Sequence, residues 1–166
     1  MKISKVVFVI SFAFLLSGCG LYKFNAISTN AESFQVNFFQ NNAPLIEPGL
    51  DIQFTNALQD IIQDQTNLTL VTSGGDIIYE GEIVEYRISP MTATADNRAA
   101  QNRLTIGVQV RYYDTLDEEN DFDQRFSFFY DYPATAQLTG STRTTAFEEI
   151  IDRLTQDIIN ASLADW

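Results

Sequence analysis

Alternation of apolar and polar residues predicts most of the strands in this chain. It is clearest from residue 103 to 113, where polar side chains take one face and five apolar ones the other: Leu104, Ile106, Val108, Val110, Tyr112. Similar patterns predict strands over 34–38, 68–72, 76–89 and 122–132. Pro90 and Pro133 are expected to stop two of them, because proline lacks the backbone N–H that a ladder uses. The alternation slips near Gly81, which predicts a bulge there.

Two other segments carry apolar residues at helical spacing. The first helix is expected to include Pro48 in its first turn and to end near Gln65 or Thr66. The second is expected to open at Thr145, which forms a capping-box pattern with Glu148. The predicted buried stripes are Leu50, Phe54, Leu58 and Ile61 on the first helix, and Phe147, Ile151, Leu154, Ile158 and Ala161 on the second.

The resulting order is β-α-β-β-β-α, and 166 residues suffice for one ordinary core. Two one-sided helices can cover one face of a sheet. We therefore expect an α+β fold: a two-layer sandwich with an antiparallel-rich sheet of four to five strands and two helices packed on one face. The other face is expected to stay open and to carry Thr105, Gln109, Arg111, Arg125, Ser127 and Phe129.

The first residues have the pattern of a bacterial lipoprotein signal. Lys2 and Lys5 precede an apolar run that is too short to span a bilayer comfortably, and Leu16-Ser17-Gly18-Cys19 matches a lipobox. Cleavage is expected between Gly18 and Cys19, with lipid attached to Cys19. The alternatives are a membrane-anchor helix and a secretory signal with an incidental cysteine. The expected organisation is a signal peptide at 1–18, a lipidated tether at 19–31 and one domain at 32–166. Gly20 favours the outer membrane, facing the periplasm.

The charge and the missing residue types exclude several functions. The chain has 22 acidic and 10 basic residues, a formal charge of -12 and no histidine. Nucleic acid would repel it. Without histidine, catalytic triads and histidine-ligated metals are excluded. No cofactor is expected. Alternating acids from Asp117 to Asp123 have the oxygen ligands that Ca²⁺ uses, but a charged, solvated hairpin is the preferred interpretation.

Two groups of charged residues are candidates for function. Glu80 and Glu82 would share a strand face and could divide acid and base roles in glycan hydrolysis. The alternative is a solvated acidic face. Arg103, Arg111 and Arg125 are candidate partner-binding residues, because guanidinium groups pair with phosphates and carboxylates. Their alternative is pairing with the many acids of this chain.

Short pieces spread over nearly all of the chain beyond the signal resemble the LptE family of lipopolysaccharide-assembly lipoproteins. In order they are Cys19-Gly20-Leu21-Tyr22-Lys23-Phe24, Val36-Asn37-Phe38-Phe39 with Asn42-Ala43 and Pro48, Phe54-Thr55 with Leu58, Gln65-Thr66-Asn67-Leu68, Gly75-Asp76, Tyr79-Glu80-Gly81-Glu82-Ile83 with Tyr86 and Pro90, Asn102-Arg103-Leu104-Thr105-Ile106, Phe126-Ser127 with Tyr130, Ile158-Ile159-Asn160, and Asp165-Trp166.

The resemblance implies two helices on a four-stranded sheet and no enzymatic activity. It also implies a partner, the large outer-membrane β-barrel LptD, which such a protein plugs, helps to assemble and assists in passing lipopolysaccharide outward. Lipopolysaccharide itself is a second candidate partner. The open sheet face and the loop from Met91 to Asn102 are expected to meet the barrel. The competing hypotheses are an adaptor lipoprotein of another outer-membrane complex and a carboxylate-dependent glycan hydrolase.

Overall fold

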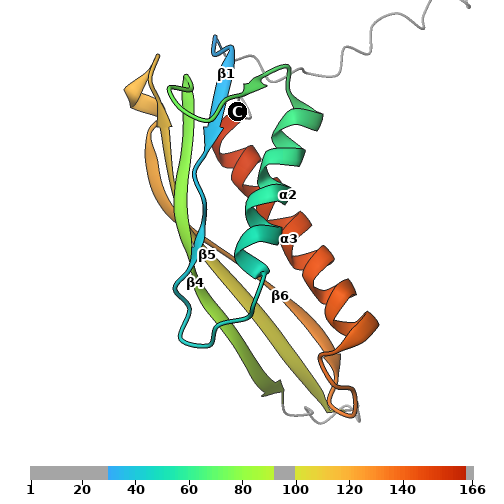
Figure 1. Cartoon of the computed structure of the whole chain (residues 1–166). Helices are drawn as coiled ribbons and strands as arrows, with labels where there is room; N and C mark the ends of the chain where they lie inside the picture. The colour runs from blue at the N-terminus through green and yellow to red at the C-terminus, as the bar shows by residue number, and fades with distance from the viewer. Residues whose placement is uncertain (1–29, 92–99, 164–166) are drawn as a thin grey trace, which may run out of the picture.

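Two helices pack on one face of a strongly twisted sheet (Figure 1), in a computed structural model that describes residues 30–91 and 100–163. This arrangement confirms the predicted α+β sandwich. The strands are β1 (Ser33–Val36), β2 (Gln40–Asn41), β3 (Thr69–Leu70), β4 (Ile77–Met91), β5 (Gln101–Asp114) and β6 (Phe122–Pro133). The helices are α2 (Leu50–Gln65), α3 (Gly140–Leu163) and the short 3₁₀ helix η1 (Glu118–Asn120).

The sheet is mixed, with strand order β3-β1-β4-β5-β6 and with β2 also paired to β4. The three long strands β4, β5 and β6 are antiparallel neighbours. By contrast, β1 runs parallel to β3 and β4, and β2 runs parallel to β4. The helix α2 is a crossover that returns the chain in the same direction, which is what a parallel pairing needs. Among the described residues the sheet has six strands rather than the expected four to five.

The extra strand arises because the first predicted strand is interrupted. The alternation through Phe34 and Val36 does not continue to Phe38, which is exposed, while Phe39 is fully buried. The ring of Phe39 packs edge-on against Phe54 at a centroid distance of 5.1 Å. Burying Phe39 turns the backbone out of the ladder over residues 37–39, and the chain pairs again as β2.

The strand β4 is longer than its sequence suggested, and its bulge lies elsewhere. The strand continues through Pro90, and the register shift falls between Ile83 and Glu85, leaving Val84 as the bulged residue. The expectations for Pro90 and for a bulge at Gly81 were therefore wrong. A Cβ on Gly81 would collide with the carbonyl of Gln109 and the ring of Phe39, so glycine is needed there for close packing.

Both helices contribute a broad apolar face to a single core. In α2 the fourth member of the buried stripe is Ile62, and Ile61 is only partly buried. Pro48 precedes Gly49, the residue before the helix, so it lies outside the first turn. The helix α3 begins at Gly140, so the expected start at Thr145 was wrong, and Ala161 is exposed. Its buried residues are Ala146, Phe147, Ile150, Ile151, Leu154, Thr155, Ile158, Ile159 and Leu163.

Candidate functional site

At the start of β1, Asp76 binds the backbone of Glu32 and Ser33 through a set of hydrogen bonds that we call the clasp. One carboxylate oxygen of Asp76 accepts hydrogen bonds from the backbone N–H of Glu32 at 2.9 Å, from that of Ser33 at 3.0 Å and from the Ser33 hydroxyl at 2.9 Å. These donors favour the ionised form and hold the pKa of Asp76 below its ordinary value.

Gly18 and Cys19, the expected cleavage and lipid-attachment residues, lie outside the described residues, as do positions 92–99 of the expected contact loop.

The three arginines predicted to bind a partner all lie on the open face. Arg103 and Arg111 are on β5 and Arg125 is on β6, at positions whose cross-strand partners also point away from the helices. The structure brings all three to one surface, and it gives each a carboxylate of this chain. Every arginine among the described residues has such a partner, the other three being Arg87, Arg143 and Arg153.

The strongest of these pairs is at Arg103. Its Nε and Nη2 donate to the two carboxylate oxygens of Asp131 at 2.7 and 2.8 Å, a bidentate geometry. The guanidinium also stacks 3.5 Å from the ring centroid of Phe129. The hydrogen bonds from Arg103 hold the pKa of Asp131 below its ordinary value. Arg103 is thus fixed in place on the face.

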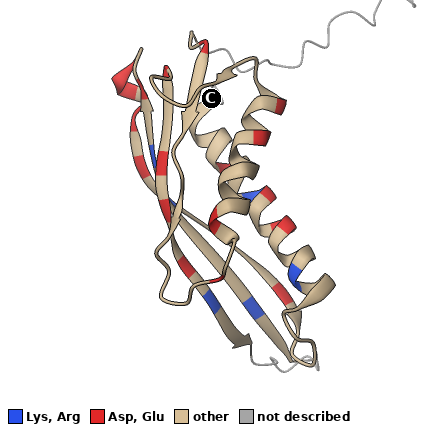
Figure 2. Cartoon of the chain, viewed as in Figure 1, with Lys and Arg blue, Asp and Glu red and all other residues tan. Residues whose placement is uncertain are grey.

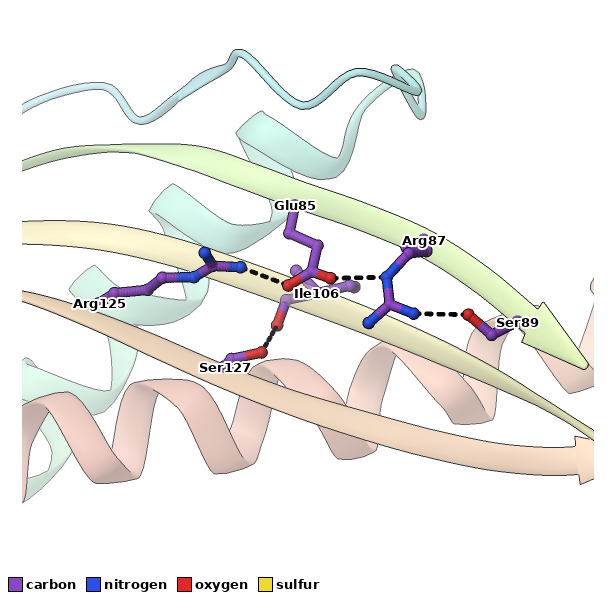
Figure 3. Close-up of polar contacts among 6 residues, drawn as sticks. All are labelled: Glu85, Arg87, Ser89, Ile106, Arg125 and Ser127. Carbon is purple, nitrogen blue, oxygen red and sulfur yellow. Dashed lines mark hydrogen bonds and ion pairs between the residues drawn. The ribbon is translucent and has the colours of Figure 1, made fainter. Parts of the chain in front are cut away.

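A second network centres on Glu85 and joins two strands across a third (Figure 3). Glu85 accepts from Nε of Arg87 at 2.9 Å and from Nη2 of Arg125, and Arg87 also donates to the hydroxyl of Ser89 at 2.7 Å. Glu85 is therefore shared by two guanidinium groups. Gly107 on β5 lies beneath this crossing, where it has no side chain to obstruct it.

The two carboxylates considered for glycan hydrolysis support the neighbouring loop. Glu80 accepts from the Asn37 amide at 2.7 Å and Glu82 from the Asn42 amide at 2.5 Å. Arg111 also lies 3.9 Å from Glu80. Both carboxylates thus hold the irregular segment around β2 against the edge of β4. This arrangement gives each of them a structural role.

The acidic hairpin between β5 and β6 uses its carboxylates to order its own backbone. Asp114 accepts from the N–H groups of Leu116 and Asp117, and Asp121 accepts from that of Asp114. Among the described residues no cluster of three or more acids is arranged to hold a metal ion. Figure 2 shows acidic residues gathered around η1, at one end of the sheet. These contacts favour the interpretation of the segment as a charged hairpin.

A hollow beside the β4 bulge was not anticipated from the sequence. It has a volume of about 400 Å³ and is lined by Pro44, Leu45, Val84, Glu85, Tyr86, Arg87 and Arg125. Burial, reinforced by the nearby Glu47 carboxylate, raises the pKa of Tyr86 to about 12. The available signal in the sequence was the consecutive apolar pair Ile83-Val84, which breaks the alternation of β4.

Neither described helix has the length and apolarity needed to cross a bilayer.

The fold is shared with several solved structures at low sequence identity. A lipoprotein B from Nitrosomonas europaea has 14% identity and a TM-score of 0.52, covering 81% of this chain and 83% of its own. A hypothetical protein from Chlamydia trachomatis has 8% identity and a TM-score of 0.55, covering 80% and 98%. PelC from Paraburkholderia phytofirmans, a dodecamer, has 9% identity and a TM-score of 0.50, covering 82% and 92%. No curated protein matches the sequence significantly.

The fold and the open face define a two-layer α+β domain of the kind found in solved bacterial lipoprotein structures. Residues 31–162 match the LptE family, described as lipopolysaccharide-assembly. The chain belongs to the LptE family. That family match covers nearly every described residue, including the whole open face.

Proposed function

We propose that the chain is an outer-membrane lipoprotein of the lipopolysaccharide-assembly machinery, and that it plugs and helps to assemble an LptD-type β-barrel. The family match over residues 31–162 supports the assembly role, and the lipobox at Gly18 and Cys19 supports the anchor. In this proposal residues 1–18 are removed, 19–31 form the lipidated tether, and 32–166 form one domain on the periplasmic side.

The observation that carries the barrel proposal is the chemistry of the open face. It is a sheet surface whose described arginines already have carboxylate partners, such as Arg103 with Asp131 and Arg125 with Glu85. Each of these arginines can approach a polar wall with a carboxylate beside it, so its desolvation in the contact costs less than that of an unpaired guanidinium. The lumen of a β-barrel is polar. The face therefore suits a lumen wall, and its role needs no catalytic step.

Lipopolysaccharide is the weaker candidate for direct contact. At Arg103 a phosphate would have to break a bidentate pair with Asp131. The excess of acids over bases in the whole chain adds repulsion. The barrel protein is therefore the proposed partner.

Affinity purification tests the barrel proposal. The full chain, tagged at its C-terminus, is purified from a detergent-solubilised envelope, and the expected result is a large β-barrel protein in the eluate. An eluate that held another envelope complex and no barrel would overturn the proposal in favour of an adaptor role. For the hydrolase hypothesis, the double variant Glu80→Gln and Glu82→Gln is compared with wild type, and full function in cells would exclude that hypothesis.

The role proposed for Cys19 is a tether that raises local concentration. Cys19→Ala, exported behind a cleavable non-lipoprotein signal, is expected to leave the membrane fraction and to weaken barrel assembly at normal expression. Overexpression is expected to restore assembly, because an excess of soluble protein replaces the effect of the tether. Failure to bind the barrel even in excess would show that the anchor does more than concentrate the protein.

A further inference from the structure

Beyond Ile83, no described strand lies beside one edge of β4. On this side β1 pairs with residues 77–79 and β2 with residues 82 and 83. The backbone N–H of Asn42 then donates to the carbonyl of Ile83 at 2.9 Å, and the chain turns away toward α2. From Glu85 to Met91 the strand pairs only with β5, on its other side. An unpaired edge of this kind is a template for another strand.

The loop that leaves the edge is braced in place beside it. The Asn42 amide is bound to Glu82, and the Asn41 amide donates to the carbonyl of Glu47 at 3.2 Å. The carboxylate of Glu47 is in turn paired with Arg143 of α3 at 2.7 Å. These contacts hold the loop at a distance from the edge, and the hollow of about 400 Å³ lies in the space between them. The gap is therefore built into the folded chain.

The hollow has an apolar part and a positively charged rim. Pro44, Leu45, Val84 and Tyr86 supply the apolar lining. On the open face, Arg87 and Arg125 share the single carboxylate of Glu85, so this group carries one net positive charge (Figure 3). The side chains of the two arginines are 60% and 52% exposed, so both retain donors that face solvent. A local positive charge is unusual in so acidic a chain.

The helix side of the same edge exposes apolar side chains. Ile88 pairs across the sheet with the buried Leu104, so it points to the helix side, yet it is exposed. Leu45, in the adjoining loop, is exposed as well. The edge thus presents apolar groups on one side and arginines on the other. Pro90 has no N–H to offer, which limits a pairing strand to the run from Val84 to Ser89.

We propose that this edge of β4, between Val84 and Ser89, binds an extended segment of a partner polypeptide that is apolar on one face and acidic on the other. The backbone of the segment would pair with the unpaired edge, while alternate side chains enter the hollow or face the arginines. Its carboxylates would complement Arg87 and Arg125. The inference goes beyond the barrel proposal: it shares Glu85 and Arg125 with the open face, but it rests on the edge and the hollow, and its test needs no barrel protein.

Two other occupants fit the observations less well. An acyl chain would fill the apolar hollow but would leave the backbone edge unpaired. A second copy pairing edge to edge would bring Arg87 against the same positive rim, which is unfavourable. The acidic, amphipathic strand satisfies the backbone edge, the hollow and the charge together.

Fluorescence anisotropy with a defined peptide tests the proposal. The probe is a labelled eight-residue peptide that alternates glutamate with valine or isoleucine, and the full chain is used in a non-ionic detergent. Saturable binding is expected, weakened about tenfold or more by Arg87→Glu and by Leu45→Glu. The controls are Arg153→Glu and Ile52→Glu, on helices outside the hollow lining. The Arg153 side chain is 57% exposed, against 60% for Arg87. Ile52 as a whole residue is 56% exposed, against 54% for Leu45.

N-methylation of alternate peptide amides separates strand pairing from simple hydrophobic capture. Methyl groups on the amides that face β4 are expected to abolish binding, and those on the other set to leave it intact. Equal binding of both methylated peptides, or competition by phospholipid alone, would show an amphiphile site and overturn the proposal. An equal loss of peptide affinity with Arg87→Glu and with Arg153→Glu would overturn the proposal that the acidic face of the segment pairs with the arginines of the hollow. Circular dichroism verifies that each variant is folded, and the methylated peptides give a test on the unmodified chain.

Discussion

The guanidinium of Arg125 reaches Glu85 by crossing over Gly107, so a residue on β6 is paired with one on β4 although β5 lies between them. A Cβ added to Gly107 would lie 3.1 Å from Nη2 of Arg125 and 3.1 Å from Cβ of Glu85. The diagonal pair thus depends on a glycine in the central strand. Sequence alternation does not indicate this contact, because it places Glu85 on the same face as Ile83, and the bulge at Val84 turns Glu85 to the open face.

The two glycines of the long strands are expected to respond differently to alanine. Gly81→Ala places a Cβ against the Gln109 carbonyl and the Phe39 ring, neither of which can move without disturbing the sheet or the core. Overpacking of this kind destabilises by about 1–3 kcal/mol. Gly107→Ala meets the mobile guanidinium of Arg125 and, at 3.1 Å, Cβ of Glu85, which must shift slightly. The change perturbs a surface ion pair worth about 0–1 kcal/mol.

Urea unfolding followed by circular dichroism measures both free energies. A larger loss is expected for Gly81→Ala, with Gly107→Ala staying within about 1 kcal/mol of wild type. Equal losses would contradict the packing assigned to Gly81.

The clasp at Asp76 is expected to make the domain sensitive to acid. Folding lowers the pKa of Asp76 from its ordinary value of 3.8, because Glu32 and Ser33 donate to the ionised form. The stabilisation is therefore present above pH 3.8 and is lost as the pH falls through the lower pKa of the folded state. Asp76→Asn should lower the urea midpoint at neutral pH, and the difference from wild type should narrow below pH 3.8.

The control for charge is Asp64→Asn, at an exposed position on α2. If Asp64→Asn reproduced the same pH-dependent difference, the effect would come from total charge and not from the clasp.

A hydroxyl pair between the buried Tyr79 of β4 and the half-buried Ser162 near the end of α3 predicts unequal losses of stability for its two variants. The hydroxyls of Tyr79 and Ser162 lie 2.8 Å apart, and Ser162 also donates to the carbonyl of Ile158 at 2.8 Å. Burial raises the pKa of Tyr79, so its phenol stays protonated and donates. Tyr79→Phe removes one hydrogen bond, at a cost of about 0.5–1.5 kcal/mol. Ser162→Ala strands the buried phenol and should cost more, about 1–3 kcal/mol.

The double variant distinguishes this mechanism from simple loss of packing. Tyr79→Phe combined with Ser162→Ala should be about as stable as Tyr79→Phe alone, since no buried donor is then left unpaired. If the losses of stability measured by thermal or urea unfolding were strictly additive, the mechanism of a buried phenol left without a partner would be contradicted.

Regular elements were predictable where one physical pattern acts alone. The alternation in β5 puts Leu104, Ile106 and Val108 in the core, as observed. The start of α3 was missed because residues 140–145 are poor helix formers and are supported by tertiary contacts. Arg143 in that first turn pairs with Glu47 and stacks 4.5 Å from the ring centroid of Phe147. Such support comes from segments distant in sequence and cannot be read locally.

In the candidate site, too, local patterns could be predicted from the sequence, whereas contacts between distant segments could not. Alternation and cross-strand order correctly gather Arg111 and Arg125 on the open face. Their partners were not predictable, since pairing depends on register, and the bulge at Val84 shifts Glu85 to face Gly107. The hollow was missed for a related reason: it exists because the loop around Pro44 is braced away from β4, a consequence of contacts with Glu82 and Arg143.

Reversing charges on the open face is expected to weaken the proposed contact with the barrel. Arg111→Glu would stand beside Glu80 and Asp123, its cross-strand neighbours, and Arg125→Glu would face Glu85. Each change removes a guanidinium from a carboxylate and puts a second carboxylate beside it, and desolvating unpaired carboxylates in a contact is costly. Recovery of the barrel protein from solubilised envelope should fall with either variant, while Arg153→Glu, on α3, should leave it unchanged.

The two variants also separate the open face from the hollow, because Arg125 lines the hollow and Arg111 does not. A fall confined to Arg125→Glu would assign the barrel contact to the hollow, and a fall with both would assign it to the face. Undiminished recovery with both, in variants whose urea midpoints match wild type, would mean that the barrel does not use this face. The matched midpoints matter, because like charges on adjacent strands also destabilise the sheet itself.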